Sequence, residues 1–263
     1  MAKIVWIASY PRSGNTWLRF LLGNLAAGPI ESSAQLLTLI PDIHRAVSAA
    51  HLHGPQSTLI KTHWAWHAAF PLREDTQGAI YLMRHPVDVL ASNLRFYARW
   101  HIGDDPATAG ERTRQWVRNY IEQGGSPRWR RDGYGSWEEN VASWTESNLP
   151  FPRLVLRYER LKSDPAAVLG EINKTLNLGR DAAAIAAAVE ASSVDRLRAM
   201  EDDEVERKQP GIFYTPQVGE RFDDAVRFIG QQAESDATYR LTDDERARAQ
   251  ERFAPALRRF GYV

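Results

Sequence analysis

The feature of this sequence that most constrains its fold is an apolar run near the start, Ile4–Ala8, which leads directly into a short turn. A continuous run of apolar and β-branched residues, without alternation, is typical of a strand buried on both faces. Leucines spaced three and four residues apart follow the turn and mark one face of a helix: Leu18, Leu21, Leu22 and Leu25. A buried strand followed by a turn and a helix favours an α/β fold with a parallel sheet.

Similar patterns recur along the chain. Three further apolar runs predict strands of the same sheet: 58–60, 79–83 and 154–156. Helix signals lie between and after them, including Pro86 at a first turn and the capping-box spacing of Ser136 with Glu139. Two polar stretches with several glycines, 101–135 and 201–236, lack a regular pattern, and we interpret them as irregular lid segments. We expect a single domain, residues 1–263, with helices on both faces of the sheet.

The composition narrows the class of partner. The chain has 263 residues, no cysteine and a formal net charge of zero. A balanced charge argues against a surface that binds nucleic acid or an anionic membrane as a whole, and the lack of cysteine excludes disulfides and thiolate nucleophiles. No apolar run approaches the roughly 20 residues that a membrane-spanning helix needs. We therefore expect a cytoplasmic protein with a small-molecule substrate and no nucleic-acid or membrane partner; a homodimer is left open.

The turn at residues 10–17 has the composition of an anion-binding site. Gly14 allows the backbone to turn tightly, and the first N–H groups of the helix, together with its dipole, favour negative charge. Hydrogen-bond donors surround this point: Arg12, Ser13, Asn15 and Thr16. The G-x-x-x-x-G-K-[ST] spacing of a Walker A loop is absent, and with it the usual magnesium ligand. A plain strand-to-helix connection built from turn residues is the alternative.

Two other strand ends carry charged or titratable side chains. Arg84 ends the third predicted strand, and Ser92 lies two turns into the following helix, so that both could converge on one phosphate. Lys61 and His63 follow the second predicted strand, at the edge where ligands enter an open α/β sheet. With an ordinary pKa near 6.5, a histidine is a usable base at neutral pH. Each feature alone also fits a structural role, such as an arginine–proline turn or a histidine bonded to a backbone carbonyl.

These motifs resemble those of the cytosolic sulfotransferases that use 3′-phosphoadenosine-5′-phosphosulfate (PAPS) as donor. The segment Tyr-Pro-Arg-Ser-Gly-Asn-Thr-Trp at 10–17 looks like the family's 5′-phosphosulfate-binding loop. The resemblance implies a 5′-phosphate site formed by Ser13, Gly14, Asn15 and Thr16. It also implies that Trp17 lies beside the adenine. The family often has lysine where this chain has Arg12, which keeps the positive charge but replaces a point charge by a planar fork.

The resemblance extends to the other strand ends. Arg84 and Ser92 have the spacing of the family's 3′-phosphate site, and His63 stands where the family has its catalytic general base. Lys61 and Arg12 are then implied to stabilise the oxygen that leaves as its bond to sulfur breaks. Further donor contacts are implied by weaker motifs at Tyr158, Ser192, Arg227 and Gly230.

The reaction that the resemblance implies is in-line transfer of the sulfuryl group of PAPS to a hydroxyl or amine, with release of adenosine 3′,5′-bisphosphate (PAP) and no metal. The implied fold is a P-loop-like parallel sheet. No motif identifies the acceptor; the aromatic residues expected to line its pocket are Trp64, Trp66, Phe96, Tyr97, Trp100, Trp129 and Tyr134. Two alternatives stay open: a P-loop small-molecule or nucleotide kinase, and a nucleotide-binding protein without catalysis.

Overall fold

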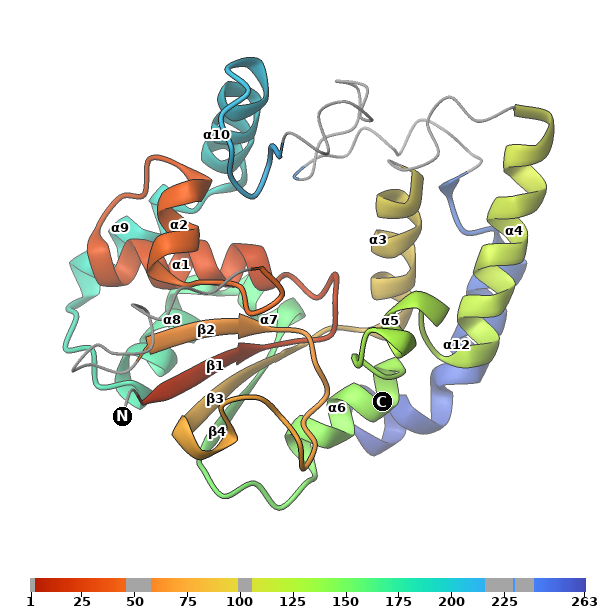
Figure 1. Cartoon of the computed structure of the whole chain (residues 1–263), viewed down its shortest axis with the longest axis horizontal. Helices are drawn as coiled ribbons and strands as arrows, with labels where there is room; N and C mark the ends of the chain where they lie inside the picture. Colours follow the sequence, from red (N-terminus) through yellow and green to blue (C-terminus); the bar gives the residue numbers. More distant parts are fainter. Residues whose placement is uncertain (1–2, 46–57, 99–105, 216–228, 230–238) are drawn as a thin grey trace.

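The structure is a computed structural model that describes residues 3–45, 58–98, 106–215, 229 and 239–263. Its centre is a parallel sheet with the strand order β2-β1-β3-β4 (Figure 1). The strands are β1 (Ile4–Ala8), β2 (Thr58–Thr62), β3 (Thr76–Met83) and β4 (Arg153–Arg157). Every strand predicted from an apolar run is confirmed, and the α/β class with them.

The four strands end at the same edge of the sheet. Ala8 pairs with Thr62 of β2 and with Tyr81 of β3, while Met83 pairs with Arg157 of β4. Because the strands are parallel, the residues that follow them in the chain meet at that edge, which is where open α/β sheets bind their ligands. The sheet therefore brings together the turns that the sequence singles out.

Alternate strand residues face two separate apolar cores, one on each side of the sheet. Trp6 and Tyr81 belong to one core, and Ile7 and Ile80 belong to the other. The first is covered by α3 (Pro86–Ala98), α4 (Pro106–Gln123), α6 (Trp137–Thr145) and α12 (Asp243–Arg259). The second is covered by α1 (Asn15–Ala27), α2 (Ser33–Leu39), α8 (Pro165–Thr175), α9 (Ala182–Ala191) and α10 (Val194–Glu206). The predicted helices on both faces are thus confirmed (Figure 1).

Short elements complete the described chain: η2 (Arg73–Asp75), α5 (Pro127–Arg131) and α7 (Tyr158–Ser163). The predicted capping box of Ser136 with Glu139 is formed, and Thr242 with Glu245 forms a second one. Ser136 and Thr242 accept from the backbone of Glu139 and Glu245, whose side chains accept in return. Across the described ranges, no helix combines the length and apolarity needed to cross a membrane.

The expectation of an irregular lid over 101–135 is wrong for the described part of that stretch. Pro106–Gln123 and Pro127–Arg131 are helices, and Val117 and Tyr120 are fully buried where α4 packs against α3 and α12. Only one side of α4 is apolar, so its many polar residues hide the helical spacing from a search for apolar runs. The second expected lid, 201–236, begins as the end of α10; its residues 216–228 and 230–236 lie outside the described residues.

Candidate active site

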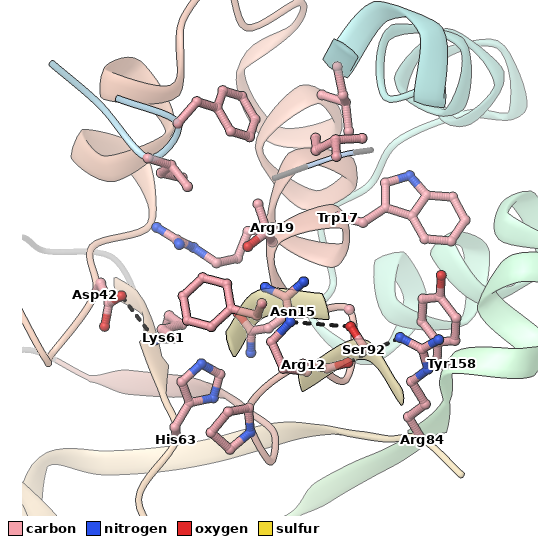
Figure 2. A pocket seen from close by; sticks show the side chains of 18 of the residues that line it. Arg12, Asn15, Trp17, Arg19, Asp42, Lys61, His63, Arg84, Ser92 and Tyr158 are labelled. Atoms are coloured by element: carbon pink, nitrogen blue, oxygen red, sulfur yellow. Dashed lines mark hydrogen bonds and ion pairs between the residues drawn. The ribbon is translucent and has the colours of Figure 1, made fainter. Parts of the chain in front are cut away.

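A cavity of about 570 Å³ lies at the edge where the strands end (Figure 2). Its lining comes from the turn after β1, from the ends of β2 and β3, and from α1, α3, α7 and α10. Most of the residues predicted as a site lie in this wall: Arg12, Gly14, Asn15, Thr16, Trp17, Lys61, His63, Arg84, Ser92 and Tyr158. The fold therefore brings together side chains as far apart in the sequence as Arg12 and Tyr158.

The turn after β1 requires glycine at position 14. Gly14 has φ 96°, and a Cβ built on it would lie 2.4 Å from the Tyr158 ring. Two contributions therefore oppose any side chain: a left-handed backbone and a close neighbour. Arg12 also has a positive φ, 68°. The backbone of this turn is thus bent sharply around the point at which α1 begins.

The same turn leaves buried polar atoms unsatisfied. Ser13 is fully buried, and its Oγ has no hydrogen-bond partner among the described residues; neither has Oδ1 of Asn15. The amide of Asn15 is oriented by donating from Nδ2 to Ile7 O and Ser9 Oγ, each at 3.1 Å. Gly14, the residue before α1, supplies no side-chain cap to the helix. Uncapped N–H groups and a buried hydroxyl at a helix start form a ready anion site.

The turn after β3 contacts the first turn through side chains. Arg84 Nη1 donates to Arg12 O at 3.1 Å, and its guanidinium lies 4.3 Å from the centre of the Tyr158 ring. Arg12 Nε in turn donates to Ser92 Oγ at 3.2 Å. Nε of Arg84 is buried and has no partner within the described part of the chain. Arg84 and Ser92 are therefore linked through Arg12, and their joint binding of a phosphate stays a prediction.

His63 is held in one tautomer. Its Nδ1 lies 2.7 Å from Ser9 O, and because a carbonyl oxygen only accepts, Nδ1 carries the hydrogen. The lone pair is then on Nε2. Burial, followed by the charge of Lys61, holds the pKa of His63 well below its ordinary value. The ring is therefore neutral at pH 7 and able to accept a proton.

Lys61 is paired with a residue that the sequence did not single out. Its Nζ lies 2.9 Å from Oδ2 of Asp42, and both side chains are largely buried (Figure 2). Burial lowers the pKa of Lys61 to about 8, although Asp42 acts in the opposite direction. Burial would raise the pKa of Asp42, but Lys61 and then His63 hold it below its ordinary range.

His44 is a second residue that no sequence motif marked. Its Nε2 accepts from the backbone N–H of His63 at 2.8 Å, and the two rings are stacked with centroids 5.7 Å apart. Burial, and then Lys61, lowers the pKa of His44 to about 4, so it too is neutral at pH 7. Asp42 and His44 lie between α2 and β2, where only an Asp-x-His spacing offered any signal, and that spacing is common in loops.

Trp17 and Ser192 are linked. Trp17 Nε1 donates to Ser192 O at 2.9 Å, and the Trp17 ring lies edge-on to Tyr158. The Ser192 hydroxyl is fully buried; it donates to Ala188 O at 2.7 Å and accepts from Asn24 Nδ2 at 2.8 Å. Ser192 thus orients Trp17 while its own hydroxyl is already satisfied.

The other predicted residues divide into three groups. Phe96 and Trp129 line the cavity, with the Arg12 guanidinium 4.8 Å from the Phe96 ring centre. Trp64 and Trp66 pack against the apolar core instead, Tyr97 stacks on Trp116, and Tyr134 lies edge-on to His44. Three predicted residues lie outside the described residues: Trp100, Arg227 and Gly230.

Comparison with known families settles which group of proteins shares this arrangement. A model of the sulfotransferase domain matches residues 3–261. The chain belongs to the sulfotransferase family. Mouse sulfotransferase 1B1 is 26% identical over 209 residues, covering 73% of this chain and 64% of the relative. Rat sulfotransferase 1A1 is 29% identical over 187 residues, covering 66% of this chain and 59% of the relative. The chain thus spans less than two thirds of the length of these two relatives.

Solved structures of proteins crystallised with PAP share the fold. Mouse sulfotransferase SULT7A1, crystallised with PAP, superposes with a TM-score of 0.63 at 19% identity, covering 97% of this chain and 84% of that one. Retinol dehydratase with androsterone and PAP gives a TM-score of 0.61 at 17% identity, covering 97% and 80%. The resemblance seen in the sequence is therefore confirmed at the level of family and fold.

Proposed function

We propose that this sulfotransferase moves the sulfuryl group of PAPS to a hydroxyl or amine on a small-molecule acceptor and releases PAP. The observation that carries the proposal is the convergence of two turns suited to anions beside a neutral histidine whose Nε2 has no hydrogen-bond partner among the described residues. Arg12, Arg84 and Ser92 are joined by hydrogen bonds at one end of the cavity, and His63 lies in the same wall. The presence of PAP in two structural neighbours adds support.

The residues present fit such a donor. The uncapped start of α1 and the unsatisfied Ser13 hydroxyl suit the 5′-phosphate, and the unsatisfied Nε of Arg84, together with Ser92, suits the 3′-phosphate. Trp17 and Tyr158 offer flat apolar faces for the adenine. When bound, the donor supplies a sulfuryl group activated by its bond to phosphate.

The chemistry then assigns roles to the buried side chains. As the acceptor oxygen or nitrogen bonds to sulfur, His63 Nε2 takes its proton, and the Nδ1–H···O=C bond to Ser9 stabilises the resulting imidazolium. The bond between sulfur and the bridging oxygen breaks, and the electron pair stays on that oxygen. Lys61 and Arg12 supply positive charge to stabilise it. Since Arg12 acts where charge develops, its replacement should lower the rate more than the nucleotide affinity.

A kinase is the main rival, and nucleotide binding separates the two. A sulfotransferase site with Arg84 and Ser92 should bind PAP far more tightly than AMP, because PAP alone carries the 3′-phosphate. Isothermal titration calorimetry with both nucleotides measures this directly. Equal affinities would contradict the proposal, as would a magnesium-dependent preference for ATP. We further propose that the protein acts as one domain in the cytoplasm.

His63 provides the catalytic test. We expect His63→Ala to lose at least about 10²-fold in turnover, the usual contribution of a positioned general base, while PAP still binds. His67→Ala is the matched control, because His67 is exposed and is not part of the described cavity lining. Normal turnover by His63→Ala would remove the histidine from this role.

A further inference from the structure

The cavity has a second end where two cations, Arg19 and Arg45, have no role in the proposed donor site. Arg84, Ser92 and Tyr158 lie together on one side in Figure 2, and Asp42, Lys61 and His63 lie on the other. An acceptor has to reach His63 to give up its proton, so it occupies the second end. The residues that line this end therefore determine which class of acceptor can bind there.

Arg19 is the unusual residue of this end. It comes from the second turn of α1, is 3% exposed, and extends toward Asp42 (Figure 2). One nitrogen, Nη2, donates to Ile40 O, but Nε is buried without a partner among the described residues. Burial lowers the pKa of Arg19 to about 10, with Asp42 opposing the shift. Burial of a guanidinium N–H costs free energy unless the N–H donates to a hydrogen-bond acceptor.

The surrounding charges do not supply that group. Asp42 is the single acidic residue among the described residues that line the cavity, and its Oδ2 is bonded to Lys61. Arg45 adds another cation at the exposed mouth, where its Nη1 donates to Gly211 O at 3.1 Å. Three cations, Arg19, Arg45 and Lys61, thus lie in this part of the lining with one carboxylate, which is paired with Lys61. This end of the cavity has an excess of positive charge before any substrate enters.

We propose that the acceptor is an anion, and that Arg19 and Arg45 bind its carboxylate or phosphate while its hydroxyl or amine reaches His63 Nε2. This inference rests on the proposed sulfuryl transfer and names the class of substrate. A neutral phenol or alcohol would leave Arg19 Nε buried without an acceptor among the described residues. A carboxylate or phosphate matches its planar donor edge and removes that penalty.

The test compares each anionic acceptor with a neutral analogue that lacks the charge, with the protein saturated with PAP. Matched pairs are 4-hydroxyphenylacetate and its methyl ester, 3-hydroxybenzoate and its methyl ester, and glycerol 3-phosphate and glycerol. Calorimetry should show at least one anion binding roughly tenfold or more tightly than its neutral partner, as expected for charge-assisted hydrogen bonds. The first two pairs report a carboxylate site and the third a phosphate site. The absence of a preference for the anion in every pair overturns the inference.

Variants separate a binding role from a structural one. Arg19→Met should remove most of the preference for the anion without weakening PAP binding. Arg19→Lys should retain part of that preference. Arg45→Met should reduce the preference for the anion by several fold. Because Arg45 is exposed, this variant still tests the inference in the case that Arg19→Met does not fold. Arg248→Met, on the outer surface of α12, is the matched control. An unchanged preference in Arg45→Met and in every folded Arg19 variant means that these arginines serve the fold alone.

The two proposals fail in distinguishable ways. If PAP and AMP bind equally, the sulfotransferase proposal fails at the donor end. If PAP is preferred but charge on the acceptor is irrelevant, only the inference about the acceptor fails.

Discussion

The turns before α1 and α3 both end a central strand and both face the cavity, yet they are built differently. The first is a backbone site: Arg12 and Gly14 have positive φ values, and the start of α1 is left without a side-chain cap. The second has an ordinary backbone. Its His85 N–H already donates to Glu159 Oε1 at 2.8 Å, so anion binding there depends on the side chains of Arg84 and Ser92.

This difference teaches where affinity and selectivity reside. Under the proposed function, any nucleotide with a 5′-phosphate should use the backbone site, because N–H groups at a helix start recognise the anion and little else. The side-chain site should then be the one that distinguishes a 3′-phosphate. Mutations in the first turn should therefore weaken the binding of all adenine nucleotides. Mutations in the second turn should weaken the binding of PAP selectively.

The largest effect is expected from Gly14→Ala. The new Cβ would lie 2.4 Å from Tyr158 in a backbone with φ 96°, which combines overpacking of about 1–3 kcal/mol with a left-handed strain of about 1–2 kcal/mol. Affinity for PAP and for AMP should fall together, on the order of 10²- to 10³-fold. Gly28→Ala is the control, because Gly28 has φ 82° but no atom within 4 Å of the added Cβ. Selective loss of PAP in Gly14→Ala would contradict a backbone site.

Arg84→Met should give the opposite pattern. Loss of a charge-assisted hydrogen bond, worth about 1.5–3 kcal/mol, predicts PAP binding about 10- to 100-fold weaker and AMP binding nearly unchanged. Calorimetry with both nucleotides measures the two effects on one sample. If AMP weakens as much as PAP, Arg84 supports the first turn through its bond to Arg12 O rather than reading a 3′-phosphate.

Lys61, at the end of β2, differs from the arginines of both turns because its charge titrates near neutral pH. Lys61, with its pKa lowered to about 8, carries its charge below pH 8 and loses it as the pH rises above that value. We expect kcat/KM to be level between pH 6.5 and 7.5 and then to fall, approaching tenfold per pH unit. Lys61→Arg, which stays charged, should abolish this alkaline limb. A limb that persists in Lys61→Arg belongs to another group.

Ser92→Ala should have the smallest effect. The single hydrogen bond of Ser92 to the ionised 3′-phosphate should contribute about 1.5 kcal/mol, the low end of the range for bonds to charged groups, so PAP binding should weaken about tenfold, with AMP binding unaffected. Ser163→Ala, at the exposed end of α7, is the matched control. A loss as large as that of Arg84→Met would mean that the main function of Ser92 is to position Arg12.

The sequence predicted the parts of the molecule that depend on local pattern. Strands buried on both faces are continuous apolar runs, and the first turn needs glycine next to donors, so both are visible in the chain. Chemical roles could be assigned mainly through the family resemblance to Lys61 and His63 at the end of β2 and to the pair Arg84 and Ser92. Their roles as donor and catalytic residues stay predictions, although the structure places them in one wall.

What could not be predicted depends on contacts between distant segments. Asp42 pairs with Lys61 and His44 stacks on His63 because a loop after α2 crosses the end of β2, and no local spacing encodes that crossing. Arg19 looks like any polar residue on a helix until α2 covers it. Helix α4 was missed because one apolar stripe on a polar helix leaves no apolar run.

The residues that follow α12 carry a practical consequence for anyone who labels or trims this protein. The Tyr262 hydroxyl donates to Glu159, whose other oxygen holds His85 N–H, and the Tyr262 ring lies edge-on to His85. Arg157 fastens the same segment by donating to the carbonyls of Phe260 and Gly261. Because Glu159 also holds the backbone next to Arg84, we expect an affinity tag joined directly behind Tyr262 to loosen the turn before α3. A removable tag and a check by intact mass should precede any measurement of PAP against AMP.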